Sequence, residues 1–196
     1  MVFDKRLKIA FVLPTKTGST ALRCYLRQYG FFRLKEKHET VDKLIELYPN
    51  LSEYKIYGFL RNPLERFEST ILYSKQNRIF SSVVASRLVE HGIDKSLEEI
   101  SYDEIIDNFA KVYDQNWALF RPQVDWLKHP LVTALDYHNM QAELNRVVAT
   151  FDEPMPVMNQ SSDFGKSVIT DKVINFVRNY YAADYQFAKD VLGKEY

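Results

Sequence analysis

The polar loop after the first apolar run of the chain carries groups suited to binding a phosphate. Residues 9–13 read IAFVL, a short apolar run typical of a strand that is buried on both faces. The loop over residues 14–20, PTKTGST, then leads into a segment with helical spacing of its apolar residues. The start of a helix attracts anions through its unpaired N–H groups and its dipole. The residues that we expect at such an anion are Lys16, Thr17, Gly18, Ser19 and Thr20.

A second polar cluster follows a later apolar run. Residues 54–60 read YKIYGFL and are followed by Arg61, and Pro63 then suits the first turn of a helix. Because the carboxyl ends of parallel strands line one edge of a sheet, we expect Arg61 to lie beside the loop over 14–20. Arg61 and Ser69 could bind a second phosphate, the arginine through two parallel hydrogen bonds.

These two clusters together resemble the donor site of a known enzyme family. The loop over 14–20 is similar to the PKTGST loop of sulfotransferases, which holds the 5′-phosphosulfate of 3′-phosphoadenosine 5′-phosphosulfate (PAPS). Residues 61–69, RNPLERFES, resemble that family's R-[ND]-P-x-x-R-x-x-S element, which binds the 3′-phosphate. Residues 121–127 resemble its Pro-Gln stretch. Residues 159–161, NQS, together with Tyr181, Asp184 and Phe187 of the last predicted helix, resemble its C-terminal N-x-S…Y-x-x-D region. The pattern is closest to the compact, carbohydrate-type sulfotransferases.

The resemblance implies roles for individual residues. Lys16 would stabilise the leaving phosphate and the bridging oxygen, while Ser19 and Thr20 would hold the 5′-phosphate with N–H groups of the loop. Lys166, in a C-terminal loop, would reach the 3′-phosphate, as a basic loop does in several members of the family. Two departures are visible. Thr15 stands where the family usually has proline, and residues 136–140, DYHNM, lack the glutamate of the family's Arg-Phe-Glu-Asn-Leu stretch.

His38 is the predicted catalytic base. A histidine titrates near neutral pH, so its neutral form can accept the proton of an acceptor hydroxyl. The chain has four histidines, and His38 alone falls between the loop over 14–20 and Arg61, just before a predicted helix. In relatives of the resembling family a histidine at this point is the base. Glu36 or Glu39 is the alternative base, or a group that orients His38.

The strands and helices expected around these residues indicate an α/β protein. Strands expected at 9–13, 54–60 and 131–135 alternate with helical segments, and a short strand is expected at 31–34. We therefore expect a P-loop-like three-layer fold, with a mainly parallel central sheet flanked by helices. The 196 residues predict a single domain, in which residues 79–116 form a helical embellishment that shapes the acceptor site. Arg66 is expected to be a structural ion-pair residue.

Composition narrows the class of protein. Lys and Arg total 26 and equal Asp and Glu, so the net charge is zero and nucleic acid is not an expected partner. The single cysteine, Cys24, excludes an internal disulfide and favours a reducing compartment. The chain shows neither a signal-peptide pattern nor a membrane-spanning apolar run, so we expect a cytoplasmic protein. No metal cluster is expected, and nothing in the sequence specifies an oligomeric state.

The leading hypothesis is an enzyme that moves the sulfuryl group of PAPS to a hydroxyl of a small-molecule or glycan acceptor, and the resemblance implies a carbohydrate. A small ATP-dependent kinase is one alternative, although the lysine precedes the glycine here and the G-x-x-x-x-G-K-[ST] order is absent. A non-catalytic protein that binds a nucleotide or a sulfated glycan on the same fold is another.

Overall fold

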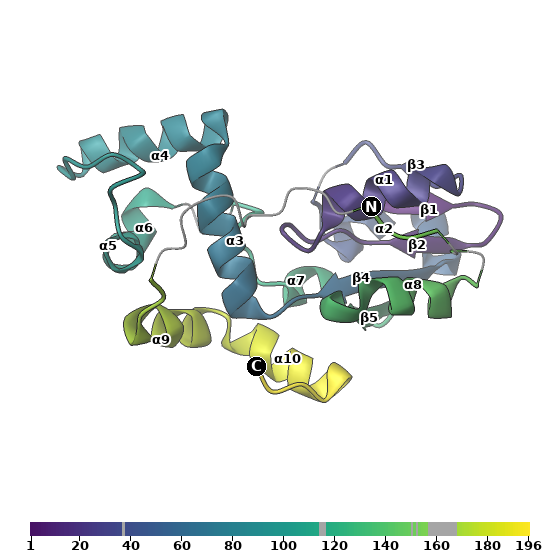
Figure 1. The fold of residues 1–196 in the computed structure, drawn as a ribbon. Coiled ribbons are helices and arrows are strands. Elements are labelled where there is room, and N and C mark those ends of the chain that lie inside the picture. The colour runs from purple at the N-terminus through teal and green to yellow at the C-terminus, as the bar shows by residue number, and fades with distance from the viewer. Residues whose placement is uncertain (37, 114–116, 150, 152, 157–167) are drawn as a thin grey trace. The chain divides into compact units, whose positions relative to one another are not determined.

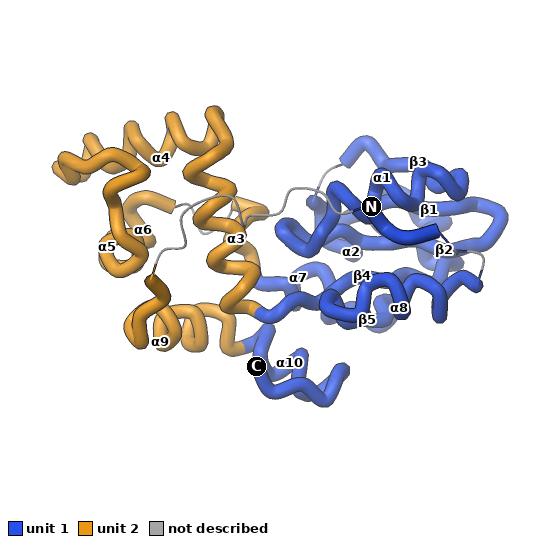
Figure 2. The backbone as a smooth tube through the Cα atoms, viewed as in Figure 1, with its two compact units in different colours: residues 1–62, 122–159, 183–196 blue, residues 63–121, 160–182 orange. Residues whose placement is uncertain are grey.

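The computed structural model describes the chain except for residues 37, 114–116, 150, 152 and 157–167 (Figure 1). Its backbone contacts divide into two compact units (Figure 2). Unit 1 comprises residues 1–62, 122–159 and 183–196, and unit 2 comprises residues 63–121 and 160–182. The expected single domain stays a prediction.

Unit 1 is built on a five-stranded mixed sheet in the order β3-β1-β2-β4-β5. The strands are β1 (Val2–Asp4), β2 (Ile9–Phe11), β3 (Phe32–Arg33), β4 (Lys55–Leu60) and β5 (Val132–Asp136). Strands β2, β4 and β5 run parallel, whereas β1 pairs antiparallel with both β2 and β3. The expected α/β class is confirmed, but the expectation of a mainly parallel sheet is wrong, because half of the pairings are antiparallel.

The antiparallel part of the sheet arises from a hairpin that the sequence analysis did not anticipate. Asp4 is buried at the end of β1, and its Oδ1 accepts hydrogen bonds from the N–H groups of Arg6 (2.7 Å) and Leu7 (3.1 Å). These two bonds tighten the turn that returns the chain to β2. The start of the chain therefore becomes a central strand beside β2, and β3 pairs on its outer edge.

Helices flank this sheet. Helices α1 (Ser19–Gln28) and α8 (Met140–Val147) share a buried cluster with Phe11, Phe59 and Leu135 of the strands. The short helix α7 (Val124–Leu127) lies against another part of β4, where a Cβ on Gly58 would come within 2.4 Å of Leu127. The remaining helical segments of this unit are α2 (Val41–Leu47), η1 (Pro49–Glu53), η2 (Tyr137–Asn139) and α10 (Ala182–Leu192), the last beginning at the unit boundary.

Unit 2 is helical and has an aromatic core. Its helices are α3 (Pro63–Gln76), α4 (Arg78–Glu90), α5 (Tyr102–Asp107), α6 (Phe109–Val112) and α9 (Asp171–Tyr180). Phe67, Phe109 and Phe120 pack against one another within this core. Arg66 is fully buried and donates to the carbonyl oxygens of Leu119 (3.1 Å) and Arg121 (2.8 Å). Arg66 thus stabilises two backbone carbonyls through these bonds, and its expected ion pair stays a prediction.

Residues 79–116 contribute α4, α5 and α6 to unit 2, and their role at an acceptor site stays a prediction. Within the described part of the chain, no helix combines the length and the apolar character needed to cross a membrane.

Candidate functional site

The loop between β2 and α1 has the geometry of an anion site. Helix α1 starts directly after Gly18, and no side chain caps its first turn. Gly18 has a left-handed backbone with φ of +68°, and an added Cβ would come within 3.3 Å of the side chains of Met140 and Tyr137. Both the backbone conformation and the space favour glycine here. The first N–H groups of α1 therefore begin at a narrow, uncapped turn, where an anion can approach the backbone closely.

Lys16 lies in the same loop as a half-buried cation. Its backbone also adopts positive φ, at +62°. Burial, together with the nearby charge of Arg61, lowers the pKa of the Lys16 ammonium to about 8. The loss of hydration and the repulsion both disfavour the charged form, and a bound anion would relieve both effects. Lys16 is therefore the group in this loop whose charge responds most directly to an anionic ligand.

Arg61 meets the loop through its side chain. The Arg61 guanidinium donates from Nη1 to the carbonyl oxygen of Lys16 at 3.0 Å, and it lies 4.7 Å from the centre of the Tyr137 ring. The two clusters that the sequence analysis placed together, the loop over 14–20 and Arg61, are therefore in contact within unit 1. Tyr137 also faces Gly18, so one aromatic ring borders both. This ring comes from the stretch that departs from the sulfotransferase pattern.

The backbone of Arg61 is held by a buried side chain that the sequence analysis had given no role. Gln123 accepts from the Arg61 N–H (3.0 Å) and donates to the Arg61 carbonyl oxygen (2.9 Å). Asp184 in turn accepts from the N–H groups of Gln123 and Val124, both at 2.9 Å. Gln123 and Asp184 are both fully buried. In the sequence, Gln123 was marked only by the Pro-Gln stretch and Asp184 only by the Y-x-x-D stretch.

His38 is anchored beside the first residues of the loop. Its Nδ1 lies 3.3 Å from the carbonyl oxygen of Leu13, and its own carbonyl accepts from the indole N–H of Trp126 at 3.1 Å. Since a carbonyl oxygen can only accept, the first contact favours the tautomer with the proton on Nδ1 and the lone pair on Nε2. His38 also has positive φ, at +58°, a conformation that costs roughly 1–2 kcal/mol for an ordinary residue.

The alternative bases differ in their surroundings. The Glu36 carboxylate accepts a hydrogen bond from the hydroxyl of Tyr48 at 2.6 Å, and this bond is the main cause that lowers the pKa of Glu36. A carboxylate with a lowered pKa is a weaker base, so His38 is better suited to remove a proton at neutral pH. Glu39 is half-buried and precedes Thr40, which caps α2.

The remaining predicted site residues are Thr17, Ser19, Thr20, Ser69 and Lys166. The Thr17 hydroxyl is buried and donates to the carbonyl oxygen of Pro14 at 2.8 Å, so its proton stabilises the loop itself. Ser19 and Thr20 form the first turn of α1 and are half-buried. Ser69 is buried in α3 and belongs to unit 2, so its predicted contact with a phosphate stays a prediction. Lys166 lies outside the described residues.

Among the residues that the structure describes, no group of His, Cys, Asp or Glu side chains is arranged to hold a metal ion. A scan against protein-family models and searches of curated proteins and of solved structures give no match to this chain. The likeness to sulfotransferases accordingly rests on the motifs of the sequence.

Proposed function

We propose that this protein is a PAPS-dependent sulfotransferase that acts on an acceptor hydroxyl, with a carbohydrate as the acceptor implied by the resemblance. The observation that carries the proposal is the hydrogen bond from the Arg61 guanidinium to the Lys16 carbonyl oxygen. It joins two sequence elements that would bind opposite ends of one nucleotide. Such a nucleotide, with anionic groups at both ends, suits two cations and an uncapped helix start better than an electrically neutral ligand would.

The residues of the loop would bind the 5′ end of the donor. The N–H groups at the start of α1 would donate to the phosphate oxygens, and Lys16 would supply a positive charge in the same loop. Arg61, oriented by Gln123 and Tyr137, would bind the 3′-phosphate. Preorganised donors of this kind stabilise developing charge without rearranging during the reaction.

His38 would remove the proton of the acceptor hydroxyl. With the Nδ1 proton donated to the carbonyl oxygen of Leu13, the Nε2 lone pair would accept the proton of the acceptor hydroxyl. The donor supplies an activated sulfuryl group, whose bond to the bridging phosphate oxygen breaks as the bond to the acceptor oxygen forms. Lys16 would stabilise the negative charge that collects on the leaving phosphate. The acceptor proton then resides on His38 and passes to solvent.

The test is calorimetric titration with adenosine 3′,5′-bisphosphate, the nucleotide product of the donor, beside ADP. We expect the 3′-phosphate to be required for tight binding. A Lys16→Ala variant should lose about 10-fold or more in affinity, because a hydrogen bond to a charged group contributes about 1.5–3 kcal/mol. Lys43→Ala removes an exposed lysine of α2 and serves as the matched control. Equal binding of ADP, or no binding of either nucleotide, would overturn the proposal and favour the kinase or a protein with another ligand.

A further inference from the structure

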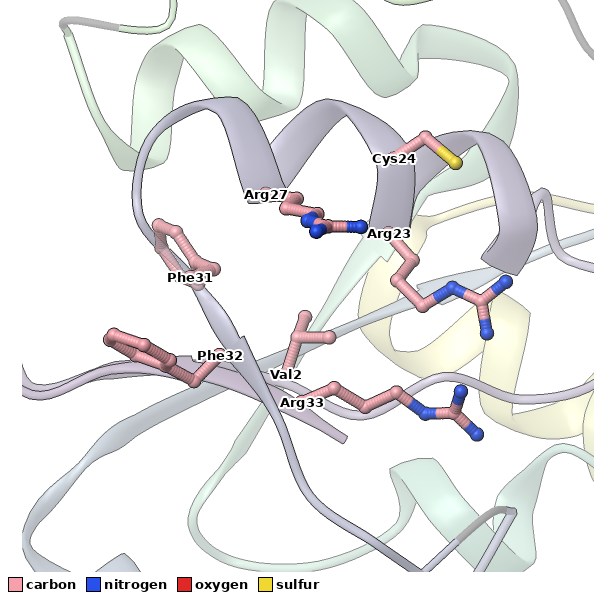
Figure 3. A pocket seen from close by; sticks show the side chains of 7 residues that line it. All are labelled: Val2, Arg23, Cys24, Arg27, Phe31, Phe32 and Arg33. Carbon is pink, nitrogen blue, oxygen red and sulfur yellow. The ribbon is translucent and has the colours of Figure 1, made fainter.

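A hollow of about 450 Å³ lies on unit 1 between α1 and the edge strand β3, and its lining shares no residue with the site described above (Figure 3). Seven residues line it. Helix α1 contributes Arg23, Cys24 and Arg27, β1 contributes Val2, and β3 contributes Phe32 and Arg33, with Phe31 directly before it. Its volume falls within the range of small-molecule sites, about 300–1,000 Å³.

Three arginines give this hollow its chemistry. Arg23 is half-buried, Arg27 and Arg33 are exposed, and none of the seven lining residues is acidic. Figure 3 shows the guanidinium groups of Arg23 and Arg33 reaching in the same direction from the helix and from the strand. Like charges that share one concave surface reinforce each other's potential and concentrate counter-ions there. The planar guanidinium also matches the oxygens of phosphate, sulfate and carboxylate.

Apolar groups supply the rest of the wall. Val2 and Phe31 are buried, with 2% and 5% of their surface exposed, while Phe32 is 63% exposed. The Phe32 ring lies 6.3 Å from the ring of Phe3, its partner across β1 and β3, and the alternation of side chains along a strand puts it on the face of the sheet opposite Arg33. Val2 and Phe31 therefore supply the apolar contact, and a compact ring that carries several oxyanion groups would meet them and the positive charge at the same place.

Arg23 and Arg27 are placed by helix geometry. Arg23 follows Ser19 by four positions and Arg27 follows Arg23 by four, so these residues lie on one face of α1. Each step along this face advances by about 6 Å. Arg23 and Arg27 are thus one and two turns past the loop over 14–20. The cations of the hollow are therefore different residues from Lys16 and Arg61 of the proposed nucleotide site.

We propose that this hollow is a binding site for a multiply charged oxyanion, in which two or more sulfate or phosphate groups are carried on a compact ring. The three arginines bind the oxyanion groups, and Val2 and Phe31 contact the ring. The site does not depend on the sulfotransferase assignment, because it uses none of the residues of the nucleotide site.

The experiment uses two probes on the full chain, sucrose octasulfate and inositol hexakisphosphate, with sucrose and inositol as uncharged controls. Titration calorimetry in about 0.15 M salt limits unspecific attraction. We expect at least one charged probe to bind, and the tighter one identifies the preferred oxyanion. The combined variant Arg23→Gln/Arg27→Gln/Arg33→Gln should weaken binding by about 10-fold or more, since each charged contact is worth a sizeable part of that factor.

A matched control removes the same charge elsewhere. Arg78, Arg146 and Arg178 are exposed and lie outside the hollow, so their triple glutamine variant should change affinity by less than about twofold. Lys16→Ala should also leave the affinity unchanged, which separates this site from the nucleotide site. Equal loss in the control triple variant, loss in Lys16→Ala alone, or no binding of either probe would overturn the proposal.

Cys24 provides a second measurement that needs no arginine variant. It is the single cysteine of the chain and lines the hollow, so its rate of alkylation by iodoacetamide reports occupancy. A saturating probe should slow alkylation several-fold in the wild-type protein, while the uncharged parent sugar should not. An unchanged rate with the probe bound would place the ligand elsewhere and refute the proposal.

Discussion

Gln123 pairs its side-chain amide with both backbone groups of Arg61, accepting from the N–H at 3.0 Å and donating to the carbonyl oxygen at 2.9 Å. The same glutamine uses its own N–H to bind Asp184, which lies on α10. The direction of the Arg61 side chain thus depends on residues 62 and more positions away in sequence. This relationship links the end of β4 to the C-terminal helix.

Asp184→Asn tests this link. The carboxylate accepts hydrogen bonds from two backbone N–H groups. In asparagine one of the two oxygens becomes an NH2 group, which cannot accept, so one backbone N–H would lose its acceptor. We expect a loss of roughly 1–3 kcal/mol in the free energy of unfolding, measured by urea denaturation. Asp190→Asn, an exposed substitution on the same helix, should change stability by less than about 0.5 kcal/mol. Equal effects of the two substitutions would mean that Asp184 does not hold Gln123.

Tyr137 is predicted to orient Arg61 through its ring. Tyr137→Phe keeps the ring against the guanidinium and should change the affinity for adenosine 3′,5′-bisphosphate by less than about threefold. Tyr137→Ala removes the ring and should weaken binding by about 3- to 30-fold, because cation–π contacts contribute about 0.5–2 kcal/mol. Titration calorimetry on both variants decides between them. A phenylalanine variant as weak as the alanine variant would assign the effect to the hydroxyl.

Gly18→Ala combines backbone strain with crowding. The positive φ alone costs an alanine roughly 1–2 kcal/mol, and the new Cβ would also press on Met140 and Tyr137. Gly193 has a similar φ of +64° with nothing within 4 Å of an added Cβ, so Gly193→Ala isolates the backbone effect. We expect Gly18→Ala to lower the urea midpoint further than Gly193→Ala does. Equal midpoints would show that the neighbours of Gly18 make room.

The lowered pKa of Lys16 predicts a pH dependence of anion binding. With a pKa of about 8 in the folded protein, Lys16 loses its charge as the pH rises through 8. An anion favours the charged form, so affinity should be greatest below pH 8 and fall by up to about tenfold per pH unit above it. Lys16→Arg stays charged throughout and should remove this dependence. Calorimetric titrations from pH 6.5 to 9.5 measure it, and identical profiles for the two proteins would contradict the assignment.

The lowered pKa of Lys16 also makes the stability of the folded protein depend on pH. Stability rises with pH, whereas the affinity for an anion falls. The folded pKa lies below the usual 10.5, so folding releases a proton between pH 8 and 10.5. Below pH 8, the cost of burying charged Lys16 lowers the free energy of unfolding by its full amount. This cost disappears as the pH rises from 8 to 10.5.

His38→Asn tests the base. Asparagine tolerates the left-handed backbone that His38 adopts, so the fold should be kept. Under the proposed function, turnover of the donor should fall about 10²- to 10⁴-fold while the affinity for adenosine 3′,5′-bisphosphate stays unchanged. His91→Asn, in an exposed position of unit 2, should leave turnover unaltered. Undiminished turnover in His38→Asn would shift the role to another group.

The sequence by itself determined the parallel part of the sheet and the position of the two elements proposed to bind the nucleotide. Buried strands are continuous apolar runs, and Gly18, Pro63 and Thr40 act on the backbone within a few residues, so local chemistry suffices to place β2, β4 and the helices that follow them. The contact between Arg61 and Lys16 follows from the same rule, because parallel strands end at one edge.

Only the tertiary structure decided what surrounds those elements. The pairing of β1 with β2 and β3 depends on a short hairpin held by Asp4, and the three residues of β1 leave too short a pattern to read. The bonds from Gln123 to Arg61, from Trp126 to His38, and the ring of Tyr137 against Arg61 join positions far apart in sequence. The arginines of α1 and β3 lie at one hollow for the same reason. The packing of the helix on the strand brings them together, and no local periodicity of the sequence predicts it.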